Sequence, residues 1–189
     1  TIFINNLNGK NLFWDSFFQI FASDYLVPVI CAFSIFSLWF LVLDSKKLLL
    51  NQKSVFYSIS AIIVTNILVW LVNNLVSRPR PFIGNSDEIQ LMFYAPTDPS
   101  FPANPVAIGF TVAASIFPAN KYLGYILLVA SLIFSFSRIY VGVFYFVDVF
   151  SAAILGFIVA LLVRKIMRTK IINLILMKQI KILRLLALS

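Results

Sequence analysis

Residues 55–76 read VFYSISAIIVTNILVWLVNNLV, an apolar run of 22 residues. As an α-helix this run would extend about 33 Å, at roughly 1.5 Å per residue. The hydrocarbon layer of a bilayer is about 30 Å thick. The run therefore predicts a membrane-spanning helix.

The composition of the whole chain agrees with a membrane protein. Of its 189 residues, 61% are hydrophobic and only 12% are charged, and the mean hydropathy is +0.96. These values exclude a water-soluble globule, a disordered chain and a disulfide scaffold. The single cysteine, Cys31, can form neither an intrachain disulfide nor a zinc cluster. We expect no metal and no cofactor.

Other apolar stretches flank residues 55–76 and predict an all-α, polytopic membrane helical bundle of about five transmembrane spans. The third and fourth stretches are short and are expected to form an inserted hairpin. Upstream, residues 11–21 have an apolar face typical of a helix that lies in the membrane interface. The five candidate spans are residues 25–43, 55–76, 106–117, 122–136 and 143–163.

Basic residues predict the orientation, because cytoplasmic loops collect Lys and Arg. Lys46, Lys47 and Lys53 place the loop after the first span inside, and alternation of the spans puts Lys121 on the same side. The basic residues that then face outward are Lys10, Arg78, Arg80 and Arg138.

The C-terminal residues 164–189 predict a basic amphipathic helix, with Lys178, Lys181 and Arg184 spaced by three residues. We expect residues 1–163 to form a single membrane domain and residues 164–189 to be a cytoplasmic tail on an anionic leaflet. Membrane sidedness accounts for the net charge of +8, so no nucleic-acid partner is expected.

Two arginines follow the 55–76 run in the segment Ser77-Arg78-Pro79-Arg80-Pro81. Each precedes a proline, which favours extended backbone. In extended backbone, side chains two residues apart point the same way. Arg78 and Arg80 are therefore candidates for phosphate binding, and the alternative is a pair of interfacial arginines.

Two further segments carry polar residues on the same predicted side. Asn104 followed by Pro105 predicts a capped helix start, which is either a plain cap or an anion site. Ser137-Arg138 precedes Asp148, and a carboxylate inside a span needs a partner. Arg78, Arg80 and Arg138 are the candidate partners, and a structural ion pair is the alternative to a functional site.

The three segments resemble the type 2 phosphatidic acid phosphatase family, whose bacterial members include undecaprenyl-diphosphate phosphatases. That family carries Lys-x6-Arg-Pro, Pro-Ser-Gly-His and Ser-Arg-x5-His-x3-Asp. The first and third motifs keep Arg80-Pro81, Ser137-Arg138 and Asp148, whereas the second keeps only its proline, Pro102. The degenerate positions are Asn73, Ala103, Asn104, Pro105 and Phe144.

The resemblance implies that both catalytic histidines are replaced. In the family, the histidine matching Phe144 attacks phosphorus, the aspartate matching Asp148 orients it, and the histidine matching Pro105 protonates the leaving group. The chain contains no histidine at all. Phenylalanine cannot be phosphorylated and proline cannot donate a proton, so the covalent route of the family is closed.

Three functions remain open. The first is a pseudoenzyme in a bacterial plasma membrane that binds phosphorylated polyprenyl or glycerolipid headgroups at its outer face through Arg78, Arg80 and Arg138. In this reading Asp148, Ser137 and Asn104 orient the site. The second is a structural or accessory subunit with membrane-protein partners. The third is an active lipid phosphatase with altered chemistry.

Overall fold

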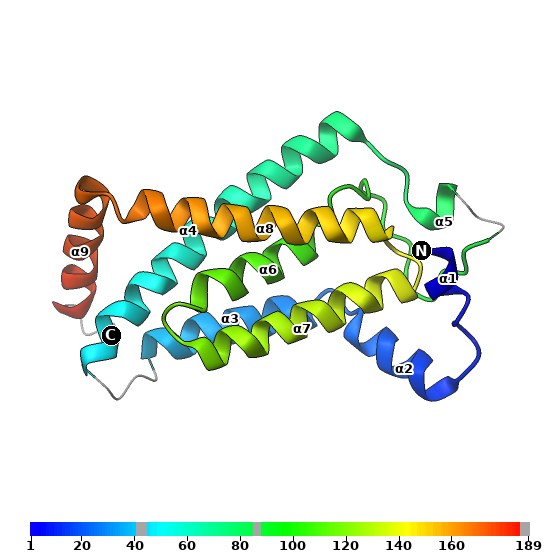
Figure 1. Cartoon of the computed structure of the whole chain (residues 1–189), viewed down its shortest axis with the longest axis horizontal. Helices are drawn as coiled ribbons and strands as arrows, with labels where there is room; N and C mark the ends of the chain where they lie inside the picture. The colour runs from blue at the N-terminus through cyan, green and yellow to red at the C-terminus, as the bar shows by residue number, and fades with distance from the viewer. Residues whose placement is uncertain (41–44, 85–87, 186–189) are drawn as a thin grey trace.

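The computed structural model describes residues 1–40, 45–84 and 88–185, and its helices form an elongated bundle (Figure 1). All regular structure in these residues is helical, which confirms the predicted all-α membrane fold. The helices are α1 (Ile2–Asn5), α2 (Leu12–Phe21), α3 (Leu26–Phe40), α4 (Ser45–Val76), α5 (Pro81–Gly84), α6 (Asn104–Ile116), α7 (Lys121–Tyr140), α8 (Phe146–Met167) and α9 (Lys170–Leu185).

Helices α4, α7 and α8 are each long and apolar enough to cross a bilayer. Helices α2 and α3 meet at a bend of 50° and count as a fourth span if taken together. Helix α6 has 13 residues, which is short for a span. Within the described residues the bundle thus contains three full-length spans, one bent pair and one short helix, where the sequence predicted about five spans.

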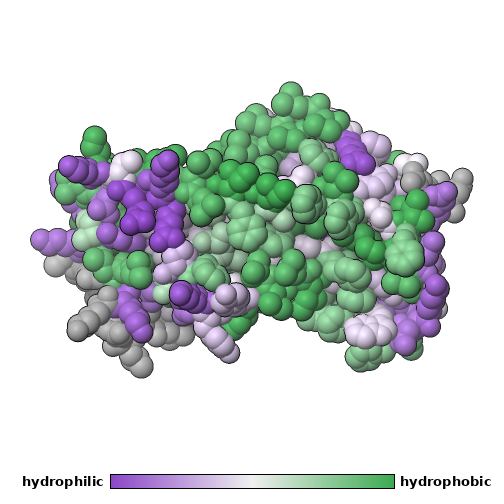
Figure 2. All heavy atoms as spheres, in the orientation of Figure 1, coloured by the Kyte–Doolittle hydropathy of each residue, from purple (hydrophilic) through white to green (hydrophobic). Residues whose placement is uncertain are grey.

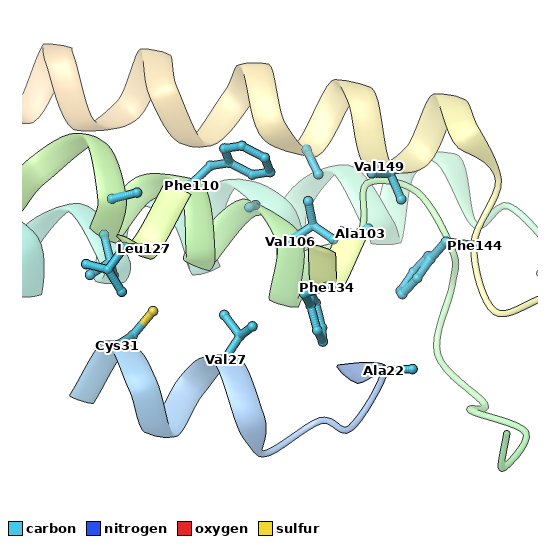
Figure 3. Packing of buried hydrophobic residues seen from close by; sticks show 14 of the residues in the cluster. Ala22, Val27, Cys31, Ala103, Val106, Phe110, Leu127, Phe134, Phe144 and Val149 are labelled. Carbon is cyan, nitrogen blue, oxygen red and sulfur yellow. The ribbon is translucent and has the colours of Figure 1, made fainter. Parts of the chain in front are cut away.

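The short helix α6 lies at the centre of the bundle and contacts α3, α4, α7 and α8. Its side chains pack into one core with those of the surrounding helices, as Figure 3 shows for Val106 and Phe110 of α6, Val27 of α3 and Leu127 of α7. Because its neighbours cover it, α6 needs no bilayer-spanning length of its own.

Close packing of α6 against α8 depends on Gly156. A Cβ atom at Gly156 would lie 2.5 Å from the carbonyl oxygen of Ala107. The hydroxyls of Thr65 in α4 and Thr111 in α6 are 3.0 Å apart and hydrogen-bonded. Small residues and hydroxyl pairs of this kind are typical of helix contacts in membranes.

The predicted boundary of the fourth span was wrong, because α7 continues past residue 136 to Tyr140. Ser135 and Ser137 donate to the carbonyl oxygens of Ser131 and Ile133, at 2.6 and 2.7 Å. Polar side chains that bond their own helix do not end it. The hairpin partner of α6 is therefore a full-length helix.

The bundle has two hydrophilic ends and an apolar middle (Figure 2). Helix α5, the N-terminus and the α7–α8 turn lie at one end, which we call the α5 end, and α9 lies at the other, the α9 end (Figure 1). Figure 2 shows a hydrophobic band between two hydrophilic ends on this face. This pattern is that of an integral membrane protein.

Candidate functional site

The three sequence-predicted arginines lie at the α5 end around the turn formed by residues 141–145. Arg78 and Arg80 lie in the segment between α4 and α5, where the backbone is non-helical as the prolines predict. Arg138 lies in the last turn of α7. The peptide nitrogen of Val143 donates to the Arg138 carbonyl at 3.1 Å, while the Val143 carbonyl accepts from Arg80 Nη1 at 3.3 Å.

Arg78 is the accessible member of this group, with 36% of its side chain exposed. Its Nη1 donates to Asp148 Oδ1 at 2.9 Å, and its guanidinium carbon lies 4.2 Å from the centre of the Tyr145 ring. Among the three candidate partners of Asp148, Arg78 therefore forms the ion pair. The Arg78 side chain stays partly exposed while it forms this pair.

Arg80 is buried and fully engaged with neighbouring groups. Its Nε donates to the Asp98 carbonyl at 2.8 Å, and its Nη2 donates to Asp98 Oδ1 at 2.9 Å. Its guanidinium carbon lies 4.4 Å from the centre of the Phe144 ring. Phe144 thus stacks against the Arg80 guanidinium. The Asp98 side chain itself is 63% exposed.

Arg138 is the most deeply buried of the three, with 1% of its surface exposed. It forms an ion pair with Asp24, in the connection between α2 and α3. The rings of Phe93 and Phe134 lie 4.9 and 5.0 Å from its guanidinium carbon. Its Nε has no hydrogen-bond partner. Arg138 therefore ties α7 to the bent α2–α3 pair.

Asp148 stabilises the start of α8 as well as pairing with Arg78. It is fully buried, and its Oδ2 accepts from the peptide nitrogen of Tyr145 at 3.1 Å, which closes a capping box. Its carbonyl accepts from the Ala103 peptide nitrogen at 3.3 Å. Asp148 thus connects the start of α8 with Ala103, the residue before α6.

The prediction that Asn104 caps a helix was wrong by one residue. Ala103 is the N-cap of α6, with no side-chain cap bond, and Pro105 lies in the first turn as expected. The Asn104 Nδ2 donates instead to Asn66 Oδ1 in α4, at 3.1 Å. This bond draws the Asn104 side chain into the α4–α6 contact and away from the free amides of α6.

Two other predicted residues form no side-chain hydrogen bond with the three arginines in the part of the chain that the structure describes. Ser137 donates to its own helix, and the buried Oδ1 of Asn73 has no hydrogen-bond partner. Sequence reasoning missed the pairing of Asp24 and of Asp98, because both carboxylates lie in irregular segments, where residue spacing does not predict contacts. Ser100 also joins the site, since its fully buried peptide nitrogen donates to the Arg78 carbonyl at 3.0 Å.

The arrangement can bind an anion at its exposed edge and can hold loops together, but the described residues offer no imidazole. They also contain no group of three His, Cys, Asp or Glu residues that could hold a metal ion. Tyr140 is hydrogen-bonded to Asp15 at 2.6 Å and does not face the arginines.

The fold and the site define a helical integral membrane protein with clustered arginines at one end. Residues 54–172, more than half of the chain, match the PAP2 superfamily, and the chain belongs to that superfamily. The matched region includes all three arginines together with Phe144 and Asp148.

Two curated bacterial proteins are similar in sequence. The bacitracin transport permease protein BcrC of Bacillus licheniformis is 32% identical over 113 residues, which covers 60% of this chain and 55% of that protein. The undecaprenyl-diphosphatase BcrC of Bacillus subtilis (strain 168) is 24% identical over 159 residues, covering 84% of this chain and 78% of that protein. The chain thus spans little more than half the length of the first relative.

Two crystal structures share the fold. Aquifex aeolicus LpxE matches with a TM-score of 0.69 and 30% identity, over 86% of this chain and 91% of that chain. The first transmembrane PAP2 type phosphatidylglycerolphosphate phosphatase from Bacillus subtilis matches with a TM-score of 0.64 and 16% identity, over 87% of this chain and 83% of that chain. The second match bears on the fold alone.

Proposed function

We propose that this protein is a non-catalytic member of the PAP2 superfamily that binds phosphorylated lipid headgroups at its α5 end, facing outward from a bacterial plasma membrane. The headgroups are those of a polyprenyl diphosphate or a phosphorylated glycerolipid. The undecaprenyl-diphosphatase relative supports the polyprenyl class.

The observation that carries the non-catalytic part is the Phe144 ring against Arg80. By the family motif, Phe144 matches the nucleophile position, and the centre of its ring lies 4.4 Å from the Arg80 guanidinium carbon. A phenyl ring there offers neither a nucleophile nor a proton acceptor. Pro105 likewise removes the general acid that the family uses.

Arg78 supports the binding part of the proposal. Its side chain is partly exposed, and it lies two residues after the end of the apolar helix α4. A phosphate group carries several acceptor oxygens that match the guanidinium fork. The exposed Asp98 carboxylate can also exchange with a phosphate for the Arg80 guanidinium.

A structural or accessory role is the second candidate, and Arg138 favours it. This arginine is almost fully buried and already paired with Asp24. A pair of this kind holds segments together and leaves little room for a ligand. Removal of the Arg78 guanidinium without loss of the fold distinguishes the two functions. Lipid binding weakens if the protein binds headgroups and is unchanged if its role is structural.

The test uses reconstituted protein and two lipids, undecaprenyl diphosphate and phosphatidic acid. Phosphate release and lipid binding are measured for the unchanged protein and for the paired variant Arg78→Gln/Asp148→Asn, which removes both charges together. We expect no protein-dependent phosphate release. We expect the paired variant to bind lipid about tenfold more weakly, because one charge-assisted contact is lost.

Lys10→Gln is the matched control, since Lys10 is another basic residue of the α5 end and is not part of the arginine cluster. Equal loss of binding in both variants would show that the effect is not specific to the arginine cluster. Unchanged binding in the paired variant would favour the accessory role. Phosphate release that disappears in Asp148→Asn would show an active enzyme and overturn the non-catalytic part.

A further inference from the structure

A second cluster of basic residues surrounds a pocket of about 350 Å³ at the α9 end, opposite the arginines discussed above. The pocket lies between α4, α8 and α9. On the face shown in Figure 2, hydrophilic residues gather over this end of the bundle. The lining residues are Leu50, Lys53, Tyr57, Arg164, Arg168 and Asn173.

Helical spacing brings the pocket's polar side chains together. Lys53 and Tyr57 are four residues apart in α4, so they share one helix face. Arg164 lies in the last turn of α8, and Arg168, four residues later, is the C-cap residue of that helix. From α9, the Oδ1 of Asn173 accepts from Lys53 Nζ at 2.9 Å. Three helices thus contribute donors to one cavity.

Apolar packing holds α9 in place beside this pocket. Leu176 and Ile180 of α9 are buried and pack against Tyr57 of α4. Tyr57 is itself 5% exposed. The pocket therefore has a fixed wall and differs from a set of basic residues along a free amphipathic tail.

No carboxylate among the described side chains balances these cations. Arg164, Arg168 and Lys53 form no ion pair there, and the acidic residues that the structure describes all lie in the other half of the molecule. They are Asp15, Asp24, Glu88, Asp98 and Asp148, several of them bonded to groups at the α5 end. Three cations around one concave site attract an anion.

We propose that this pocket binds a phosphate group, as the headgroup of an anionic lipid or as free phosphate. Arg164 and Arg168 supply guanidinium forks that match phosphate oxygens, and Lys53 supplies a point charge. The Tyr57 hydroxyl and the Asn173 amide add neutral donors. Basic pockets between membrane helices are suited to such headgroups. This site is separate from the one at the α5 end and does not depend on the proposed function.

The experiment counts phosphatidic acid molecules bound to the full chain in detergent, by native mass spectrometry. The test variant is Arg164→Gln/Arg168→Gln. We expect the number of tightly bound phosphatidic acid molecules to fall by one, with a loss of affinity of at least about tenfold at that site. This result is expected whether or not the α5 end also binds the lipid, so failure of one proposal is distinguishable from failure of the other.

The matched control is Lys165→Gln/Lys170→Gln, which removes the same charge from exposed residues of α8 and α9 outside the pocket. Equal losses in the two double variants, or no loss in either, would overturn the proposal. If Arg164→Gln/Arg168→Gln fails to fold, Arg168→Gln alone serves, because Arg168 is exposed. It should still weaken phosphatidic acid binding more than Lys165→Gln.

The source of the phosphate is resolved by a second arm with inorganic phosphate, titrated calorimetrically into the same proteins. Binding of inorganic phosphate that depends on Arg164 and Arg168 indicates a soluble ligand. Arginine-dependent binding of phosphatidic acid alone indicates a lipid headgroup. Arginine-independent binding of both probes would overturn the site.

Discussion

Phe144 packs against a buried arginine of the candidate site. A histidine at this position would add a polar ring, whereas the phenyl ring lies with Arg80 in a buried cation–π contact. Such contacts contribute up to about 2 kcal/mol when water is excluded. The Phe144 ring thus stabilises a buried cation.

We predict that Phe144→Leu lowers the free energy of unfolding by roughly 1–3 kcal/mol, because it removes the stacked ring and some packing volume. The measurement is the unfolding transition in detergent. Phe33→Leu is the control, since Phe33 is 71% exposed on α3 and should change stability by less than about 0.5 kcal/mol. Equal losses of stability in Phe144→Leu and Phe33→Leu would contradict a stabilising contact between Phe144 and Arg80.

Ion pairs at the α5 end should differ in importance according to the burial of the arginine. Asp24→Asn leaves Arg138, which is 1% exposed, without its counterion, and we predict a loss of about 3 kcal/mol. Asp148→Asn leaves Arg78, which water can reach, and keeps an acceptor for the Tyr145 peptide nitrogen. Its predicted loss is about 1–2 kcal/mol.

A double-mutant cycle of Asp148→Asn with Arg78→Gln measures the second pair directly. We expect the double variant to regain part of the loss, because neither charge is then left alone. A larger loss of unfolding free energy for Asp148→Asn than for Asp24→Asn would show that burial of the arginine does not determine how much each ion pair stabilises the fold.

Residue-level prediction from the sequence worked where the backbone restricts the choice. The prolines after Arg78 and Arg80 predicted the non-helical segment that carries them, and the need for a carboxylate partner predicted an arginine for Asp148. The partner of Arg138 could not be predicted in this way. Asp24 lies 114 residues away in a bend between two helices, and local spacing carries no information about that contact.

At the level of helices, the crossing of α6 and α8 sets the position of the site. The Ala103 nitrogen bonds the Asp148 carbonyl just outside this crossing, so a shift of α6 would move both motifs. The crossing is close because Gly156 has no side chain. Adding one carbon there would press on the backbone of α6.

We therefore predict that Gly156→Ala destabilises the bundle by about 1–3 kcal/mol through overpacking. The unfolding transition measures this loss. Gly84→Ala makes the same change where the nearest obstacle is the Tyr145 hydroxyl, at 2.8 Å, and that side chain can move. The Gly84→Ala control should lose less stability than Gly156→Ala. An equal loss of stability would show that the α6–α8 contact can relax.

Helix prediction from hydropathy succeeded for the apolar interiors and failed at polar ends. The predicted span 122–136 ended too early because the polar pair Ser137-Arg138 follows it and lowers the local hydropathy. In the structure the Ser137 hydroxyl bonds within α7. Likewise, α4 begins at Ser45, ten residues before the apolar run, in a polar section that includes Asn51 and Lys53.

For the whole molecule, the separation of charge along the bundle bears on its orientation. Lys53, Arg164 and Arg168 lie at the α9 end, whereas the described carboxylates lie in the other half. Positive residues collect on the cytoplasmic side of membrane proteins. The α9 end is therefore predicted to be cytoplasmic, and the two phosphate sites proposed above would face opposite leaflets.

Single-cysteine labelling tests this orientation in a Cys31→Ser background. Thr97 and Lys121 are both exposed, and they lie at opposite ends of the bundle, since Asp98 pairs with Arg80 at the α5 end while Lys121 begins the 20-residue helix α7. We predict that a membrane-impermeant thiol reagent added to intact cells labels Thr97→Cys and spares Lys121→Cys. Lysed cells should show labelling of both positions, which confirms that each thiol can react. The reverse pattern in intact cells would invert the molecule and place the Arg78 site in the cytoplasm, where outer-leaflet headgroups cannot reach it.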